Sequence, residues 1–156
     1  MPNVGGARAS KRRVLASIVH SQLLYAAPVW HKVTNNCKLM QRLRRIQRIM
    51  SIRVCSTYKK GSGEVIGVIA EIALIDLLIQ ERYDRYHGMD KNLGRTKLLQ
   101  QWQGKWNNGI YGRWTNRLIP DIQLWLNRQY GEVDYFMSQA LSGDGFFRKY
   151  LYDRPS

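Results

Sequence analysis

The residues from Cys37 to Tyr58 constrain the fold most, because their apolar side chains repeat at helical spacing. Their sequence is CKLMQRLRRIQRIMSIRVCSTY. The apolar residues that follow one another at intervals of three or four are Leu39, Leu43, Ile46, Met50 and Val54. In an α-helix, residues at these intervals share one face. The pattern therefore predicts a long amphipathic helix that packs this stripe against a core.

The face of this helix opposite the apolar stripe is positively charged. At about 100° per residue, Arg44 and Arg48 point almost directly away from the stripe. The polar residues expected on or beside that face are Lys38, Gln41, Arg44, Arg45 and Arg48. Ile49 and Ile52 lie among them, which indicates a second contact surface.

Charge is divided unevenly along the chain. Residues 1–63 contain 13 Lys and Arg and no Asp or Glu, whereas residues 64–156 contain 12 basic and 11 acidic residues. Runs of charge are often only solvated faces. A solvated helix, however, normally interleaves both signs at spacings that allow ion pairs. We therefore expect the cations of residues 1–63 to serve a negatively charged partner.

The 156 residues suffice for one compact domain or two small helical ones. Apolar residues make up 44% of the chain, so a packed core is expected. Because no alternating apolar–polar stretch of any length occurs, the fold class is predicted to be all-α. The run from Val65 to Ile79 is too short to cross a membrane and is interrupted by Glu71 and Asp76. A membrane-surface helix is a weaker option, because the helix at residues 37–58 has no Trp or Phe on its apolar face, so no membrane partner is expected.

The two cysteines indicate a reduced, intracellular protein. Cys37 and Cys55 lie on the same predicted helix, about 27 Å apart at 1.5 Å per residue, and cannot pair while it is intact. No Cys-x-x-Cys motif occurs.

A first helix is predicted from Ser10, as its cap, to about Ala27, with Pro28 ending it. The apolar residues expected to face inward are Val14, Leu15, Ile18, Val19 and Leu23. The first turn carries Lys11, Arg12 and Arg13, although cations at a helix N-terminus oppose the helix dipole. This unfavourable placement again indicates that the charges serve an external partner.

The rest of the chain reads as further helices in two groups. The polar stretch from Gly88 to Gly94 is the best internal boundary. It predicts a basic helical domain at residues 1–87 and a Trp- and Tyr-rich helical region at residues 88–156. Trp102 and Trp106 can in principle stack on bases, but their spacing of four favours packing in a core.

No catalytic residue, metal ligand or cofactor site is predicted. The three histidines are His20, His31 and His87, and none has the Cys or His spacing of a zinc site. The Gly61–Gly63 turn before a helix is similar to an anion-binding loop, but it lacks the lysine and the preceding strand of a P-loop. No nucleophile-elbow motif occurs.

Four segments, in order, resemble the C-terminal part of reverse transcriptases from insect non-LTR retrotransposons of the jockey-like and ribosomal-DNA-inserting kinds. These segments are MPNVGGARASKRR, LLYAAPVW, GRWTNRLIPDI and QALSGDGFFRKYL. The resemblance covers nearly the whole chain. It implies the end of the polymerase domain, namely the thumb and the linker beyond it.

The resemblance also implies what the chain lacks. The family's catalytic aspartates belong to a palm that would precede Met1, and its Cys/His zinc knuckle would follow Ser156. The chain is therefore expected to be an excised or degenerate piece that is not an enzyme by itself. Asp144 and Phe147 depart from the family's common His and Cys. The segment from Glu64 to about His87 reads as one helix, or as two with a joint near Ile72 to Leu74. Ala73–Leu74 replaces a Pro-Pro pair of the family, which favours the continuous helix, so we expect helical hydrogen bonding through residues 72–75.

The sequence and the resemblance together predict a surface that grips the primer–template backbone of RNA or DNA. The residues expected to contact it are Lys11, Arg12, Arg13, Lys38, Gln41, Arg44, Arg45 and Arg48. The remainder of the reverse transcriptase would be the other partner, and a nuclear location follows by resemblance. The alternative is a helical protein-interaction module that uses the basic amphipathic helix, together with Ile49 and Ile52.

Overall fold

The computed structural model describes residues 8–57, 61–129 and 133–143, and within these ranges all regular secondary structure is helical. The helices are α1 (Ala9–Leu24), α2 (Ala27–Trp30), the 3₁₀ helix η1 (His31–Asn35), α3 (Cys37–Cys55), α4 (Gly63–Ile69), α5 (Ile75–Tyr86), α6 (Lys91–Asn108), α7 (Arg113–Leu118), α8 (Ile122–Leu126) and α9 (Tyr135–Ser142). The prediction of an all-α fold is confirmed for these residues. The departures from the family at Asp144 and Phe147 lie outside the described residues, as do residues 1–7 and residues 58–60.

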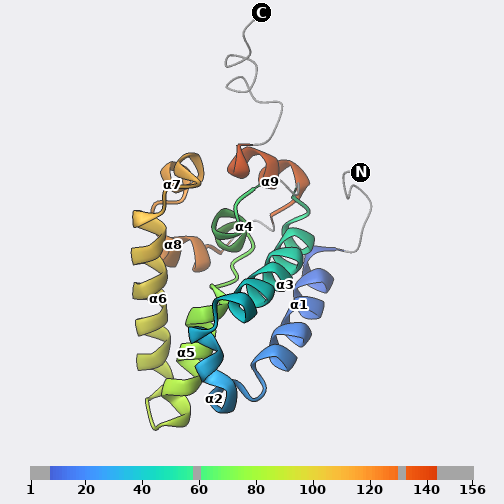
Figure 1. Ribbon diagram of the computed structural model, residues 1–156. Helices are drawn as coiled ribbons and strands as arrows, with labels where there is room; N and C mark the ends of the chain where they lie inside the picture. Colours follow the sequence, from blue (N-terminus) through green and yellow to red (C-terminus); the bar gives the residue numbers. More distant parts are fainter. Residues whose placement is uncertain (1–7, 58–60, 130–132, 144–156) are drawn as a thin grey trace, which may run out of the picture.

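The helices surround α4, which occupies the middle of the molecule (Figure 1). α1 and α3 run side by side, α6 follows the opposite side next to α5, and α7 lies beside α9. The residues of α4 from Val65 to Ile69 are all buried, because neighbours cover this short helix all round. The core therefore forms around the apolar helix α4, against which both an N-terminal helix (α3) and the C-terminal helix α9 pack.

α1 packs differently from the prediction. Its predicted inward residues Leu15 and Ile18 are 62% and 51% exposed, whereas Ala16 is buried. The small alanine side chain lets α1 approach α3 closely, which leaves the larger aliphatic residues outside. The helix begins at Ala9 rather than at a Ser10 cap and ends at Leu24, and Pro28 lies in the first turn of α2.

α3 forms as expected, but its buried face is turned by about 70° from the predicted stripe. Leu39 and Ile46 of that stripe are 39% and 41% exposed. The residues that α3 buries are Met40, Gln47, Met50, Ser51, Val54 and Cys55. The polar members are satisfied inside the protein, since the Ser51 hydroxyl donates to the carbonyl oxygen of Gln47 at 3.0 Å. Polar side chains therefore occupy part of the inward face of α3, and the spacing of apolar residues alone does not predict this.

The prediction of a continuous helix through residues 72–75 is wrong. α4 ends at Ile69 and α5 begins at Ile75. Glu71 adopts the left-handed conformation with φ +61°. Its amide donates to the carbonyl oxygen of Val68 at 3.1 Å, and the amide of Ile72 donates to that of Gly67 at 2.9 Å. This is the Schellman pattern that ends a helix, formed here without glycine at the left-handed position.

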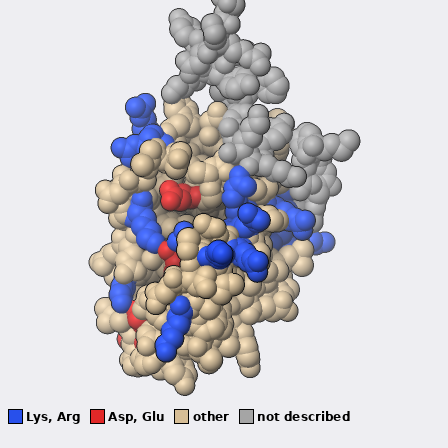
Figure 2. Space-filling model, in the orientation of Figure 1, with Lys and Arg blue, Asp and Glu red and all other residues tan. Residues whose placement is uncertain are grey.

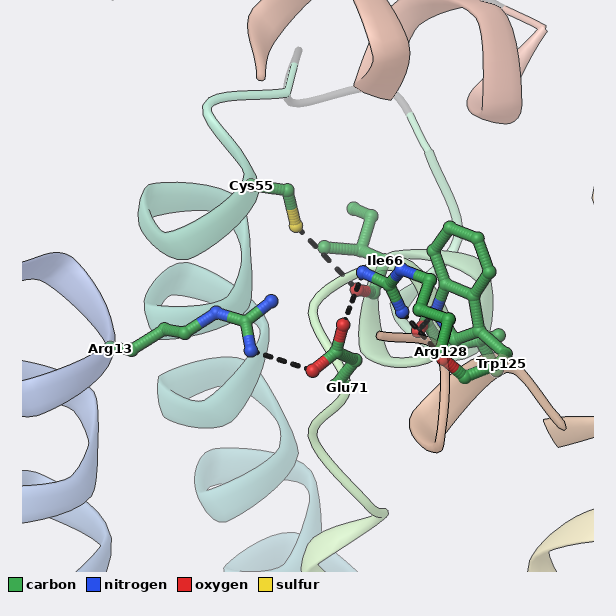
Figure 3. Close-up of polar contacts among 7 residues, drawn as sticks. Arg13, Cys55, Ile66, Glu71, Trp125 and Arg128 are labelled. Atoms are coloured by element: carbon green, nitrogen blue, oxygen red, sulfur yellow. Dashed lines mark hydrogen bonds and ion pairs between the residues drawn. The ribbon is translucent and has the colours of Figure 1, made fainter. Parts of the chain in front are cut away.

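Side chains from distant segments hold this break in place. The buried Gln47 side chain donates to the carbonyl oxygen of Ala73 at 2.7 Å and accepts from the amide of Ile75 at 2.9 Å. Glu71 forms ion pairs with Arg13 of α1 and with Arg128, which follows α8 (Figure 3). Contacts with distant segments thus stabilise the bend between α4 and α5, although no proline is present there.

The predicted core role of the tryptophans in α6 is confirmed. Trp102 and Trp106 are buried, and the indole of Trp106 donates to the carbonyl oxygen of Ile119 at 2.8 Å. They belong to one apolar cluster with Val54 and Ile66, so the cluster draws on both sides of the predicted boundary after residue 87. The boundary itself falls in the turn between α5 and α6, and the division into two domains stays a prediction.

Candidate functional site

α3 is the platform for the candidate site, and both of its ends are well defined. The Asn36 side chain accepts a hydrogen bond from the amide of Leu39 at 3.2 Å, as expected of an N-cap. The helix ends at Ser56, which has φ +55°. Because residues 8–57 contain no Asp or Glu, any carboxylate near α3 comes from later in the chain.

Four polar residues form what we call the α3 basic surface, namely Lys38, Gln41, Arg42 and Arg45. All four are exposed, and their spacing of three or four residues places them on one side of the helix. Figure 2 shows Lys and Arg side chains gathered over α3 and the neighbouring end of α1, and the acidic atoms visible in this view lie to the left of this group. Among the described residues, no carboxylate lies within ion-pair distance of Lys38, Arg42 or Arg45.

Arg42 was missing from the predicted site because the predicted inward face was displaced. Counting Gln47 and Ser51 as core residues turns the helix and brings Arg42 outward beside Arg45. The only signal in the sequence is the spacing of Gln47 and Ser51 with Val54, which is helical although two of the three are polar.

The Arg44 side chain does not point directly away from the core as predicted, but lies at the edge of α3 that faces α5. Its guanidinium is 3.5 Å from Asp76, and the same carboxylate oxygen accepts from Lys105 of α6 at 2.6 Å. Burial alone raises the pKa of Asp76, but the hydrogen bond and charge of Lys105, together with the charge of Arg44, outweigh it, so the pKa lies below its ordinary value. The carboxylate stays ionised and reduces the charge that Arg44 offers to a partner.

Arg48 is half-buried and does not point directly away from the core as predicted. Its guanidinium donates to the carbonyl oxygen of Gly61 at 2.9 Å. With Arg44 and Lys105 it lines a cleft of about 650 Å³ between α3, α4 and the end of α6, which Asp76 and Glu64 also line. Since three cations and two carboxylates share the cleft, its charge is nearly balanced.

The three cations at the start of α1 have different surroundings. Lys11 is exposed. Arg12 is half-buried and donates to the Ser56 hydroxyl at the end of α3, and Arg13 pairs with Glu71 at 2.6 Å. Arg12 and Arg13 therefore fix α1 to its neighbours, and Lys11 alone of the three projects toward solvent.

Within the described ranges, no three His, Cys, Asp or Glu side chains come together as metal ligands would. Burial lowers the pKa of His20, and it raises the pKa of the Cys55 thiol to about 12, whereas Cys37 is exposed. Among the described helices, none combines the length and apolar character needed to cross a membrane.

The described residues thus define an all-α protein with a one-sided positive surface on α3. No protein-family model matches the chain, and no solved structure matches it. The chain is 24% identical, over an alignment of 169 residues, to a 115 kDa protein in the type-1 retrotransposable element R1DM of Drosophila melanogaster. The alignment covers 93% of this chain but only 17% of the relative's length. This weak similarity supports an origin in a retrotransposon.

Proposed function

We propose that the chain is a nucleic-acid-binding, thumb-like C-terminal part of a non-LTR retrotransposon reverse transcriptase. It contacts the primer–template backbone and is not catalytic by itself. The remainder of such a polypeptide is its natural partner, and the site of action is the nucleus. The resemblance to jockey-like and ribosomal-DNA-inserting elements and the similarity to the R1DM protein both support this reading.

The observation that carries the proposal is the α3 basic surface. Lys38, Arg42 and Arg45 extend into solvent in a segment without carboxylates. Phosphate oxygens are satisfied by flexible cations of this kind, and such contacts position a protein on nucleic acid without reading its sequence. The spacing of three and four residues along α3 lets successive cations reach successive phosphates.

The eight predicted contact residues divide into two roles under this proposal. Lys38, Gln41 and Arg45, joined by Arg42, contact phosphates directly, and Lys11 extends the surface onto α1. The residues that hold the protein together at its edge are Arg12, Arg13, Arg44 and Arg48. Their charge still contributes to the long-range attraction of a polyanion.

The first test is the dependence of duplex affinity on salt. If about four to six phosphates are contacted, a plot of log K against log salt should have a slope of roughly −4 to −5. Fluorescence anisotropy with a labelled RNA–DNA duplex at several salt concentrations measures this slope. A slope near zero would remove the electrostatic basis of the proposal.

A matched pair of triple variants tests the location of the site. Lys38→Gln/Arg42→Gln/Arg45→Gln should weaken binding to all duplex sequences alike and reduce the salt slope by roughly one for each lost contact. The control variant removes three exposed cations elsewhere, at Arg82, Lys91 and Arg117. Equal effects in the two variants would show that only net charge matters. Circular dichroism must show both variants folded.

The second candidate function is a helical protein-interaction module. The observation that favours it is an exposed apolar surface on α1 and α3, beside the α3 basic surface. Variants distinguish the two functions. Removal of the exposed cations should weaken duplex binding, whereas removal of the exposed aliphatic residues should not.

A further inference from the structure

α1 exposes a strip with an apolar centre. Lys11, Leu15, Ile18 and Gln22 follow one another at spacings of four, three and four residues and therefore lie along one side of the helix. Leu15 is 62% and Ile18 51% exposed, and the neighbouring Val14 is 59% exposed. Exposed aliphatic side chains in one contiguous group commonly mark a contact surface.

α3 exposes a strip of the same pattern. Arg42, Ile46, Ile49 and Arg53 are again separated by four, three and four residues. Ile46 is 41% and Ile49 48% exposed, and both arginines are exposed. Ile49 thus belongs to the second contact surface that the sequence indicated, whereas Ile52 is half-buried against the core. Each strip spans about 17 Å, or three helical turns.

The two helices that carry these strips pack as antiparallel neighbours (Figure 1). Arg12, near the start of α1, donates to Ser56 at the end of α3, while Leu24, at the end of α1, packs in one cluster with Met40. The apolar centres of the two strips therefore lie at similar levels along this pair of helices. Lys11 and Arg53 lie at one end of the combined surface and Arg42 at the other.

We infer that this α1–α3 surface binds an acidic amphipathic helix of a partner protein. An apolar stripe of such a helix would cover Leu15, Ile18, Ile46 and Ile49, in the manner of a helix that lies in a groove. Its carboxylates would pair with Lys11, Arg42 and Arg53, for which the first 57 residues of the chain supply no acidic partner. Charge complementarity of this kind selects the partner and its orientation.

Other occupants fit the surface less well. A second copy of the chain would bring together two surfaces of the same positive sign, which repel each other. A membrane surface attracts basic amphipathic helices, but these usually carry Trp or Phe among their buried residues. The exposed apolar residues of the two strips are all Leu, Ile or Val.

The test uses synthetic stapled helices of about 18 residues that carry Leu at positions i, i+3, i+4 and i+7 and Glu on both flanks. A helix of the same composition with scrambled Leu positions, and one with Lys in place of Glu, are the control peptides. Anisotropy titration of the full chain should show binding of the amphipathic Glu helices alone. Leu15→Ala/Ile18→Ala should weaken this binding at least tenfold, and Arg53→Gln should reduce its salt dependence.

The matched protein control is Leu93→Ala/Leu124→Ala, since these leucines on α6 and α8 are 60% and 72% exposed. It should bind the Glu helices as the wild type does. Duplex affinity should not change in Leu15→Ala/Ile18→Ala, so a failure of this inference leaves the nucleic-acid proposal standing. The inference is overturned if no Glu helix binds, if the scrambled helix binds equally or if the control variant loses as much affinity. Binding to phosphatidylserine vesicles in place of the peptides, or a dimer in sedimentation that Leu15→Ala/Ile18→Ala dissolves, would also overturn it.

Discussion

Residues 8–57 and residues 61–143 contribute to the protein in opposite ways. The largest fully buried side chains come almost entirely from the later region, with Cys55 and Ser51 the only members from the earlier one. The earlier region carries no acid and exposes both cations and aliphatic residues. The comparison shows that one part of the chain builds the interior while the other presents a surface to partners.

The later region also supplies the groups that hold the earlier one. Glu71 pairs with Arg13 of α1, and Asp76 pairs with Arg44 of α3. In return, Gln47 of α3 satisfies the backbone between α4 and α5. Carboxylates of the later region therefore neutralise part of the positive charge of the earlier one. The cations of the α3 basic surface, which have no such ion pair among the described residues, face solvent.

The largest expected effect is a difference in the free energy of unfolding between apolar substitutions in the two regions. Trp102→Ala should lower the free energy of unfolding by about 3–5 kcal/mol, because it removes a large buried side chain and leaves a cavity. Leu15→Ala should change it by less than about 0.5 kcal/mol. Urea denaturation followed by circular dichroism measures both. Similar losses in the two variants would show that α1 also buries its aliphatic residues.

A smaller effect is expected where the two regions are joined by Gln47. Gln47→Ala leaves the carbonyl of Ala73 and the amide of Ile75 buried without a partner, which should cost about 2 kcal/mol. Gln41→Ala, on the exposed face of the same helix, is the control and should cost almost nothing. Hydrogen exchange at the amide of Ile75 should become faster only in the first variant. Unchanged exchange there would mean that the break between α4 and α5 does not depend on Gln47.

The smallest effect concerns the link between Arg44, Asp76 and Lys105. Because the pKa of Asp76 is lower in the folded than in the unfolded protein, the unfolded chain takes up the proton first as the pH falls. The stabilisation is therefore complete above the unfolded value of about 4 and is lost as the pH falls through the folded pKa. Asp76→Asn should lower stability by about 1 kcal/mol at neutral pH.

The difference between wild type and Asp76→Asn should shrink below about pH 4, the ordinary pKa of an aspartate. The pKa of Asp84 is also lowered, because hydrogen bonds from Lys97 and Gln80 and the positive charge of Lys97 outweigh the effect of burial. Its contribution has the same sign in both proteins and cancels in the comparison. Thermal unfolding at a series of pH values measures the difference. A gap that widens in acid would contradict the assigned direction.

The sequence predicts the helices better than it predicts their orientation. The apolar spacing in α3 and the tryptophan pair of α6 identify those helices. Asn36 and Asp121, residue types that commonly cap helices, lie directly before α3 and α8. The apolar stripe of α3 misled about its inward face, because Gln47 and Ser51 are polar and yet buried. Their partners are backbone groups that only the folded chain brings near.

For the segment between α4 and α5, the sequence allowed a joint near residues 72–74 but favoured a continuous helix, for a related reason. Without proline or a glycine at position 71, the local sequence favours a helix. The left-handed conformation of Glu71 is held by arginines 58 residues before it and 57 residues after it in the sequence. For the candidate site, composition identifies the basic segment of the chain. Which of its cations are exposed depends on tertiary contacts with Asp76, Ser56, Gly61 and Glu71.

The unequal environments of the two cysteines provide a natural handle for experiments. Only Cys37 is exposed, whereas burial and a pKa of about 12 keep the Cys55 thiol protonated and unreactive. A maleimide dye or spin label should therefore attach at a single position in the native protein without any engineered substitution. That position precedes Lys38 at the first turn of α3, so the label would report directly on whatever approaches this helix.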